Sequence, residues 1–133
     1  QEFDASVCTD ITGFGLLGHL LETLKGSNCG AQIKLETLPA LSGVLDVMAK
    51  GIFSSLQPQN SKVRQMIENQ NDYLNHPKYP LLFDPQTCGG LLAAVDQENF
   101  NDCLETLKAA GYQSSCCVGK VLETSPTHLI KLV

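Results

Sequence analysis

The sequence predicts one domain with the architecture of an α/β sandwich around a mixed sheet. Helical and strand-like hydrophobic patterns follow one another along the chain, in the order helix, strand, helix, loop, strand, helix, strand, strand. The chain has 133 residues, of which 43% are hydrophobic, and this is enough to bury a single core. We therefore expect one compact α/β (α+β) unit.

The first helix is expected to begin near Thr12. The leucines that follow fall on one arc of a helix, at Leu16, Leu17, Leu20, Leu21 and Leu24. Asp10 or Thr12 is expected to cap the start, and Gly26 or the stretch 28–30 is expected to end the helix. This pattern predicts an amphipathic helix with one apolar side.

A strand, a second helix and a long loop should follow. Residues 31–36 alternate between apolar and polar, which is typical of a half-exposed strand. Pro39 opens a helix that Gly51 ends, with an apolar face made of Leu41, Val44, Leu45 and Met48. Residues 54–79 are rich in Ser, Gln and Asn, so we expect a surface loop with a short helix after Ser61, either a functional loop or a lid against a partner.

The last third of the sequence returns to regular patterns. The apolar run 91–95 predicts a strand buried on both faces. Asp96 should cap the next helix, which Gly111 closes and in which the apolar positions are Phe100, Cys103, Leu104 and Leu107. Two strands complete the pattern, 116–122 and 128–133, joined through the turn-prone Ser125–Pro126.

Charge and composition argue against several classes of function. Lys and Arg total 9 against 14 Asp and Glu, and the net charge of −5 provides no positive field for nucleic acid. No stretch approaches the roughly 20 apolar residues of a membrane helix, and residues 1–6 do not resemble a secretion signal, so we expect a soluble cytoplasmic protein. The six cysteines are irregularly spaced without a Cys-x-x-Cys pattern, so we expect reduced thiols and no zinc site.

A carboxylate, hydroxyls and glycines lead into the first helix, in the run Cys8-Thr9-Asp10-Ile11-Thr12-Gly13-Phe14-Gly15-Leu16-Leu17-Gly18-His19. Free amides at a helix start attract phosphate, glycines let a ligand approach the backbone, and a carboxylate can hold the Mg²⁺ that neutralises phosphates. A capped helix whose glycines allow close packing explains the same residues, and the run matches neither the dinucleotide nor the Walker pattern. Both interpretations stay open.

His19 is interpreted as interfacial rather than as a base, because no second His or carboxylate is paired with it in sequence.

A second motif, Asp84-Pro85-Gln86-Thr87-Cys88-Gly89-Gly90, precedes the apolar run at 91–95. Pro85 stiffens the approach, and Gly89 and Gly90 permit conformations or close contacts that a side chain would block. The motif predicts a turn and leaves a ligand site open. Cys88 is the thiol best placed for reactivity, but no base or helix start that would activate it is evident nearby, so we do not expect a catalytic cysteine.

Together the two motifs resemble those of the selenophosphate synthetases, or selenide, water dikinases. Residues 9–19 resemble the family's Thr-Asp-Val-Thr-Gly-Phe-Gly-Leu-Leu-Gly-His, with Ile11 in place of Val. Residues 84–92 resemble its Asp-Pro-Gln-Thr-Ser-Gly-Gly-Leu-Leu, with Cys88 in place of Ser, a change that replaces a hydroxyl by a weaker donor. The resemblance covers essentially the whole chain, which would correspond to the second half of the family's full-length protein.

The resemblance implies a fold, a reaction and partners. The fold is a three-layer α/β/α sandwich with a mixed sheet, partly ferredoxin-like, as in the C-terminal domain of aminoimidazole ribonucleotide synthetase-related proteins. Residues 1–133 would form this one domain, and the amino-terminal ATP-binding domain, its partner in a full-length homodimer, would be absent from the chain. The implied reaction converts ATP, selenide and water into selenophosphate, AMP and phosphate, with Mg²⁺ as cofactor.

The resemblance also implies which residues face the nucleotide. Asp10 matches the aspartate that joins upstream aspartates in holding magnesium at the ATP phosphates, so the metal ligand is Asp10 and the expected nucleotide-binding residues are Thr9, Asp10, Thr12, Gly13 and Gly15. The family's catalytic Cys or selenocysteine lies in the absent half, so no catalytic residue is expected in this chain, and the chain alone should be inactive.

Two other hypotheses stay open. The chain could be a non-catalytic binding or dimerisation module that docks a partner on the glycine side of its first helix, or a superfamily relative acting on another phosphoryl-transfer substrate.

Overall fold

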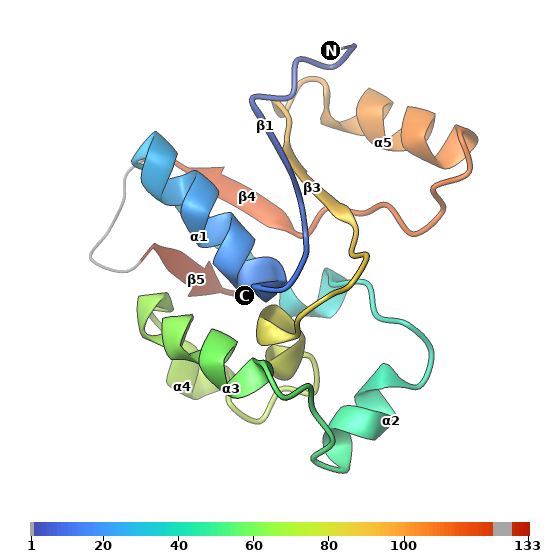
Figure 1. The fold of residues 1–133 in the computed structure, drawn as a ribbon. Coiled ribbons are helices and arrows are strands. Elements are labelled where there is room, and N and C mark those ends of the chain that lie inside the picture. The colour runs from blue at the N-terminus through green and yellow to red at the C-terminus, as the bar shows by residue number, and fades with distance from the viewer. Residues whose placement is uncertain (1, 124–128) are drawn as a thin grey trace.

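The fold contains two small sheets surrounded by helices (Figure 1). It was obtained as a computed structural model that describes residues 2–123 and 129–133. The strands are β1 (Val7–Asp10), β2 (Gly30–Ile33), β3 (Leu91–Ala94), β4 (Gly119–Leu122) and β5 (Ile130–Leu132). β1 pairs with β3 in an antiparallel ribbon, while β2 lies between β4, to which it is antiparallel, and β5, to which it is parallel. The predicted α+β class with a mixed sheet is confirmed, and the β1–β3 ribbon is separate from that sheet.

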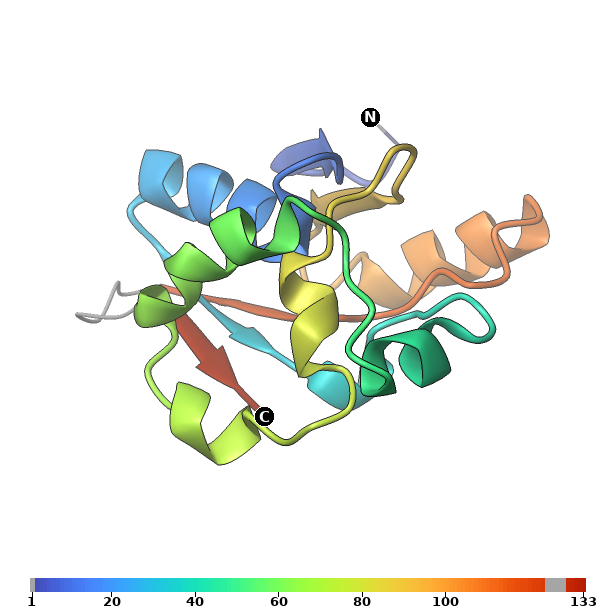
Figure 2. The ribbon, with the colours of Figure 1, turned by 60° about the horizontal axis from the view of Figure 1, so that its bottom comes forward.

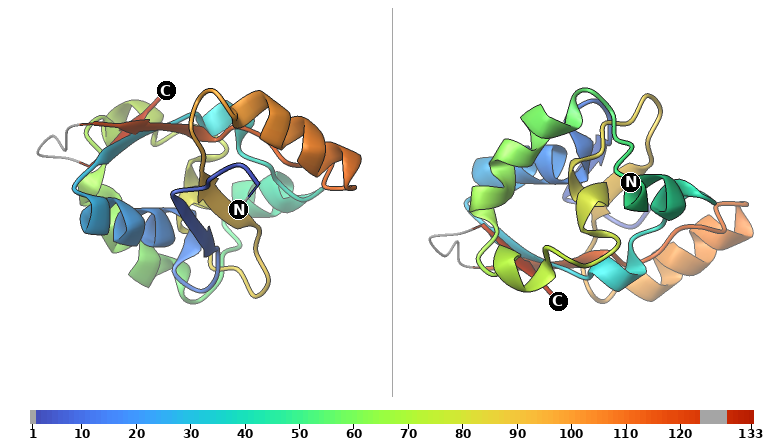
Figure 3. Two further views of the ribbon diagram at one scale, coloured as in Figure 1. Left: turned by 90° about the horizontal axis from the view of Figure 1, so that it is seen from above. Right: turned by 90° about the horizontal axis from the view of Figure 1, so that it is seen from below.

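Several of the helices lie on one side of the three-stranded sheet (Figure 2). Figure 2 shows α1, α3 and the 3-10 helix η3 there, whereas α5 lies off to one side in both views of Figure 3. Within the described residues, no helix has the length and apolar character needed to cross a membrane. The helices are α1 (Gly15–Ser27), η1 (Leu35–Thr37), α2 (Val44–Ala49), α3 (Gln57–Asn60), η2 (Ser61–Met66), α4 (Gln70–Tyr73), η3 (Tyr79–Phe83) and α5 (Phe100–Ala109).

The hydrophobic core lies between α1 and the three-stranded sheet. The predicted leucine arc supplies one wall, because Leu17, Leu20, Leu21 and Leu24 are all buried and Leu16 packs at its edge. β2 and β5 supply the other wall, and η3 adds the fully buried Leu82. Fully burying one leucine side chain contributes about 1.5–3 kcal/mol, so this arc is a main source of the fold's stability and fixes where α1 lies.

The start of α1 differs from the prediction, whereas its end agrees. The helix begins at Gly15, and no side chain caps it. Asp10 belongs to β1, and the hydroxyl of Thr12 lies 3.0 Å from a ring nitrogen of His19, so neither side chain serves the helix amides. Asn28 closes the helix in a left-handed conformation with φ of 52°, as the stretch 28–30 predicted.

The segments after β2 are shorter than predicted. The strand expected over 31–36 ends at Ile33, and η1 follows it directly. The helix expected from Pro39 begins only after Gly43, whose φ of 83° interrupts helical geometry, and Leu41 is therefore 83% exposed. Gly51 follows the end of α2 at φ of 74°, as predicted.

The prediction of a surface loop over 54–79 is wrong for the four buried residues in it, Gln57, Asn60, Ile67 and Tyr79. Ile67 also makes an isolated parallel bridge with Ile130. The two amides are buried at little cost because backbone carbonyl groups accept their hydrogen bonds. The short helix predicted after Ser61 is present as η2.

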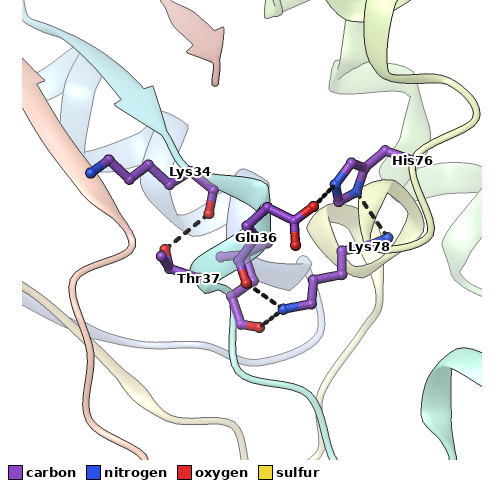
Figure 4. A network of polar contacts seen from close by, with 6 residues as sticks. Lys34, Glu36, Thr37, His76 and Lys78 are labelled. Atoms are coloured by element: carbon purple, nitrogen blue, oxygen red, sulfur yellow. Dashed lines mark hydrogen bonds and ion pairs between the residues drawn. The ribbon is translucent and has the colours of Figure 1, made fainter.

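Polar contacts fasten η1 to the chain that leads into η3 (Figure 4). The Nε2 of His76 lies 2.9 Å from a carboxylate oxygen of Glu36, and the Nζ of Lys78 donates to the carbonyl oxygens of Glu36 and Leu38. The backbone N–H of Lys78 donates to the Nδ1 of His76, so the neutral imidazole carries its proton on Nε2, facing the carboxylate. The side chains of His76 and Lys78 therefore both attach the segment before η3 to η1.

The strand at 91–95 is present as β3, but the prediction that both of its faces are buried is wrong. Leu91 is 75% exposed, and burial alternates along the strand. The reason is that β3 pairs only with β1, and no other described element forms a layer over the outer face of this ribbon.

The remaining C-terminal predictions are partly confirmed. Asp96 does not cap α5, because the helix begins at Phe100, Asn99 holds the capping position and no side chain caps the helix. The carbonyl group of Asp96 accepts the Asn99 N–H in the preceding turn. Gly111 closes that helix at φ of 101°, as predicted. The two last strands are shorter than expected, at Gly119–Leu122 and Ile130–Leu132, while the predicted turn at Ser125–Pro126 and residue His128 lie outside the described residues.

Candidate functional site

The two sequence motifs lie against each other in space. The N–H of Ile11 donates to the carbonyl oxygen of Gly90 at 2.9 Å, and the N–H of Gly89 donates back to Ile11 at 3.1 Å. The N–H of Gln86 donates to the carbonyl oxygen of Thr12 at 3.0 Å. These bonds extend the β1–β3 pairing into both loops, so the motifs form one double loop in front of α1.

Gly89 is the glycine that this pairing requires. A Cβ atom built on it would stand 2.2 Å from the carbonyl oxygen of Ile11, a distance that no real side chain tolerates. A Cβ on the neighbouring Gly90 would meet nothing within 4 Å. The prediction that this glycine pair allows a close contact is confirmed, and the contact involves Gly89.

The glycines of the first motif divide between two roles. Gly15 is buried with φ of 71°, its added Cβ would lie 2.9 Å from the carbonyl carbon of Phe83, and its N–H already donates to Thr12. Gly15 therefore serves the close packing of α1 on η3, which was the alternative interpretation of this motif. Gly13 is exposed, and nothing lies within 4 Å of the Cβ position. Its backbone is open to a ligand.

His19 fixes the loop rather than taking part in exposed chemistry. It is 8% exposed, and its Nε2 accepts the backbone N–H of Thr12 at 3.1 Å. Because an N–H group can only donate, the neutral ring carries its proton on Nδ1, which lies 3.7 Å from a carboxylate oxygen of Glu22. The interpretation of His19 as an interfacial residue is confirmed.

Asn60 joins the motifs from a segment in which the sequence predicted only a surface loop. Its Nδ2 donates to the carbonyl oxygens of Gly13, at 2.8 Å, and Phe83, at 3.0 Å. Nothing in the sequence identifies this role, because Asn60 lies in a polar stretch with other Asn and Gln residues of similar appearance. Asn60 is the positioning residue that sequence reasoning missed.

Asp10 lies at the exposed end of β1, opposite Leu91. Its carboxylate makes no hydrogen bond or ion pair with any other described residue, and the hydroxyl of Thr9 donates to its backbone carbonyl group at 3.3 Å. Over residues 2–123 and 129–133, no three side chains of His, Cys, Asp or Glu gather into a metal site. Asp10 can therefore offer one carboxylate to a metal ion, and a full magnesium shell would need oxygen atoms from elsewhere.

Cys88 is exposed at the tip of the second motif. All six cysteines are free thiols. In the part of the chain that the structure describes, no side chain makes a hydrogen bond with the Cys88 thiol, and no histidine ion pair lies beside it. The geometry therefore supplies no activating group for a cysteine nucleophile at this position.

Comparison with known proteins identifies the family. The family model of the AIR synthase related protein, C-terminal domain, matches residues 1–131. The chain belongs to this family. Among proteins similar to this AIR synthase related domain are the "Selenide, water dikinase" of Pelobacter propionicus, 37% identical over 122 residues, and that of Burkholderia ambifaria, 37% identical over 115 residues. The protein of the same name from Clostridioides difficile is 31% identical over 136 residues.

These alignments cover most of the AIR synthase related domain but only part of each relative. They include 92%, 86% and 99% of this chain, against 35%, 32% and 38% of the three relatives. The chain thus spans about a third of the length of the curated relatives that it matches. The resemblance of the two motifs to selenide, water dikinases is confirmed at the level of the domain.

Proposed function

We propose that this chain is the C-terminal domain of a selenide, water dikinase. The whole enzyme would convert ATP, selenide and water into selenophosphate, AMP and phosphate, and would act in the cytoplasm as a homodimer. The similarity to three proteins of that name supports the reaction, and the six free thiols suit a reducing compartment. The partner of this domain would be the amino-terminal, ATP-binding part of the same protein.

Within that enzyme, the double loop would face the phosphates of ATP. The observation that carries this proposal is that Asp10 presents an unpaired, exposed carboxylate in front of a loop whose backbone is fixed by hydrogen bonds. Carboxylate oxygen is the ligand that Mg²⁺ prefers, so Asp10 fits one position of a magnesium shell. Mg²⁺ would neutralise phosphate charge there, and the amino-terminal half would supply its other protein ligands.

The other predicted residues would support this position in different ways. Gly13 would let a phosphate approach open backbone, and Thr9 and Thr12 would shape the loop on either side of it. Gly15 would contribute through packing, since its N–H is already bonded to Thr12. The catalytic cysteine or selenocysteine that the family resemblance implies would belong to the amino-terminal half, so we propose that the isolated chain does not catalyse the reaction.

Activity measurements on the full-length protein that carries this chain test the proposal. Phosphorus NMR should show selenophosphate and AMP forming only when ATP, Mg²⁺ and selenide are all present, and the 133-residue chain should form neither product. ATP consumption that ignores selenide would favour a superfamily relative with another substrate. Failure to consume ATP at all, in a protein that is folded, would favour the non-catalytic module.

The hypothesis of a non-catalytic binding module has less support in the structure than in the sequence. Its proposed docking face was the glycine side of α1, and the backbone of Phe83 and Asp84 already covers Gly15 on this side. Calorimetry separates the two hypotheses for the isolated chain. Measurable binding of Mg-ATP would favour a retained phosphate site, and self-association without nucleotide binding would favour the module.

A further inference from the structure

His19 holds the double loop through an acceptor atom that a proton can remove. The residue is 8% exposed, and its Nε2 accepts the backbone N–H of Thr12 at 3.1 Å. The hydroxyl of Thr12 lies 3.0 Å from the same nitrogen and can donate to it as well. A ring nitrogen accepts a hydrogen bond only while it carries no proton, so this arrangement requires the neutral form of His19.

Thr12 is the residue at which the parts of the site meet. Its carbonyl oxygen accepts the N–H of Gly15 at the start of α1 and the N–H of Gln86 in the second motif, both at 3.0 Å. Its own N–H donates to His19. Thr12 therefore fixes the first motif to α1 and to the second motif, directly before the open backbone of Gly13.

A second proton on the ring of His19 would change the partners of Thr12. It would go to Nε2, because Nδ1 already carries a proton and lies 3.7 Å from the carboxylate of Glu22. The hydroxyl of Thr12 can turn and accept a hydrogen bond from the new Nε2–H, whereas the backbone N–H can only donate and would face another donor. Leaving a partly buried donor unpaired costs free energy, so the backbone at Thr12 would move away from the ring.

The other titratable groups around α1 do not replace this acceptor. Across residues 2–123 and 129–133, Glu22 is the only charged residue that forms an ion pair with His19. β1 and η3 pack on α1, and η2 lines a hollow together with it. The titratable and charged side chains on those three elements are Cys8, Asp10, Lys62, Arg64 and Tyr79. Histidine is the side chain whose charge ordinarily changes between about pH 5 and 8, so a change of loop structure in that range is expected to come from His19.

We propose that protonation of His19 releases Thr12 and thereby loosens the double loop in acid. His19 is then a positioning residue, which holds the loop in its described form only while the ring is neutral. If the double loop faces the ATP phosphates, the full-length enzyme binds Mg-ATP more weakly once His19 is protonated. This consequence rests on the proposed function, whereas the release of Thr12 does not.

NMR of the 133-residue chain, from about pH 8 to about pH 5, tests the release. The ring signals of His19 and the amide signal of Thr12 should shift with one midpoint. Protection of the Thr12 amide against hydrogen exchange should fall by roughly fivefold or more, as expected for the loss of one hydrogen bond. The N–H of Ala31 donates to Leu129 at 2.8 Å in the three-stranded sheet, so it should keep its protection as an internal control.

Three results of this titration would overturn the proposal. The first is a His19 ring that stays neutral down to about pH 5. The second is constant protection of the Thr12 amide while the ring titrates. The third is an equal loss of protection at Thr12 and Ala31, because this would indicate general unfolding instead of a local release.

His19→Gln is the matched variant. The oxygen of the glutamine amide can accept the Thr12 N–H and does not titrate, so protection of Thr12 should stay nearly constant over the same pH range. His76→Gln alters a histidine outside the double loop, at the contact with Glu36, and should keep the full change of the unmodified chain. A loss of Thr12 protection in His19→Gln as large as in the unmodified chain would contradict the role of His19.

The full-length enzyme provides a separate measurement of the consequence for the nucleotide. Between about pH 8 and about pH 6, the KM for Mg-ATP should rise more in the unmodified enzyme than in His19→Gln. His76→Gln should behave as the unmodified enzyme does. If the NMR results hold and this difference in KM is missing, the coupling of His19 to Thr12 stands and the proposed place of the ATP phosphates is wrong.

Discussion

The side-chain amide of Asn60 donates to the carbonyl oxygen of Gly13 at 2.8 Å, across 47 residues of the sequence. The same nitrogen donates to Phe83 at the end of η3. A single side chain thus ties the open glycine in front of α1 to the segment that enters the second motif. The position of the double loop therefore depends on residues far outside both motifs.

Replacing Asn60 by alanine should destabilise the domain. Two carbonyl groups would lose their donor, and leaving the buried carbonyl group of Phe83 unpaired costs about 1–3 kcal/mol. Urea denaturation measures this change in the free energy of unfolding. Asn71→Ala, at an exposed position in α4, is the matched control and should change the free energy by less than about 0.5 kcal/mol. Equal stability of the two variants would show that the Asn60 bonds do not hold the loops.

The glycine pair of the second motif offers an adjacent comparison. Gly89→Ala should destabilise the domain by about 1–3 kcal/mol, because the new methyl group would force Ile11 away and disturb the pairing of the loops. The methyl group of Gly90→Ala would meet no neighbouring atom, so this variant should be neutral or more stable by about 0.4 kcal/mol. Calorimetric melting of both variants checks the prediction. A larger effect at Gly90 than at Gly89 would contradict the observed contact.

The thiol of Cys116 should react with iodoacetamide only slowly at neutral pH. Burial raises the pKa of Cys116, the neighbouring Cys117 raises it further, and Lys78 and Lys108 act in the opposite direction. The thiolate is the reactive form, so the reaction rate should rise with pH through a midpoint above the ordinary value for a cysteine. Mass spectrometry of the labelled peptide, over a range of pH, gives this midpoint.

Unfolding and a charge substitution provide controls for this titration. In strong denaturant the midpoint should fall toward the ordinary value, because burial, the largest cause of the raised pKa of Cys116, is lost. Lys108→Gln removes a nearby positive charge that favours the thiolate, so the midpoint should move further upward. A midpoint that is the same in the native and unfolded chain would contradict the described surroundings of Cys116.

Local patterns in the sequence predicted the features that depend on neighbouring residues alone, such as the apolar side of a helix and the residue that ends it. Five leucines at helical spacing are sufficient to define the buried side of α1, because the 3.6-residue period alone brings them together. The turn at Asn28 and the helix ends at Gly51 and Gly111 were likewise predicted, since each depends on a left-handed residue at a known position.

The features that the sequence did not predict depend on contacts between distant segments. Asn60 can be buried because two carbonyl groups from other segments accept hydrogen bonds from its side chain. No local sequence pattern predicts these contacts. An apolar run such as 91–95 indicates a strand but not how many of its faces are covered. Leu91 is exposed because the strand pairs only with β1. Gly13 and Gly15 differ in role because η3 lies against Gly15 and leaves Gly13 open. This contact depends on a distant segment, so the sequence pattern did not indicate the difference.

The turnover of an Asp10→Asn variant in the full-length protein tests the phosphate site most directly. Asparagine keeps the size of the side chain and removes the negative charge that a magnesium ion would contact, so selenide-dependent formation of AMP should fall by roughly 100-fold or more. Asp102→Asn, at an exposed position in α5, should retain the activity of the unmodified enzyme. If the Asp10→Asn enzyme turns over as fast as the Asp102→Asn enzyme, Asp10 holds no metal at the ATP phosphates.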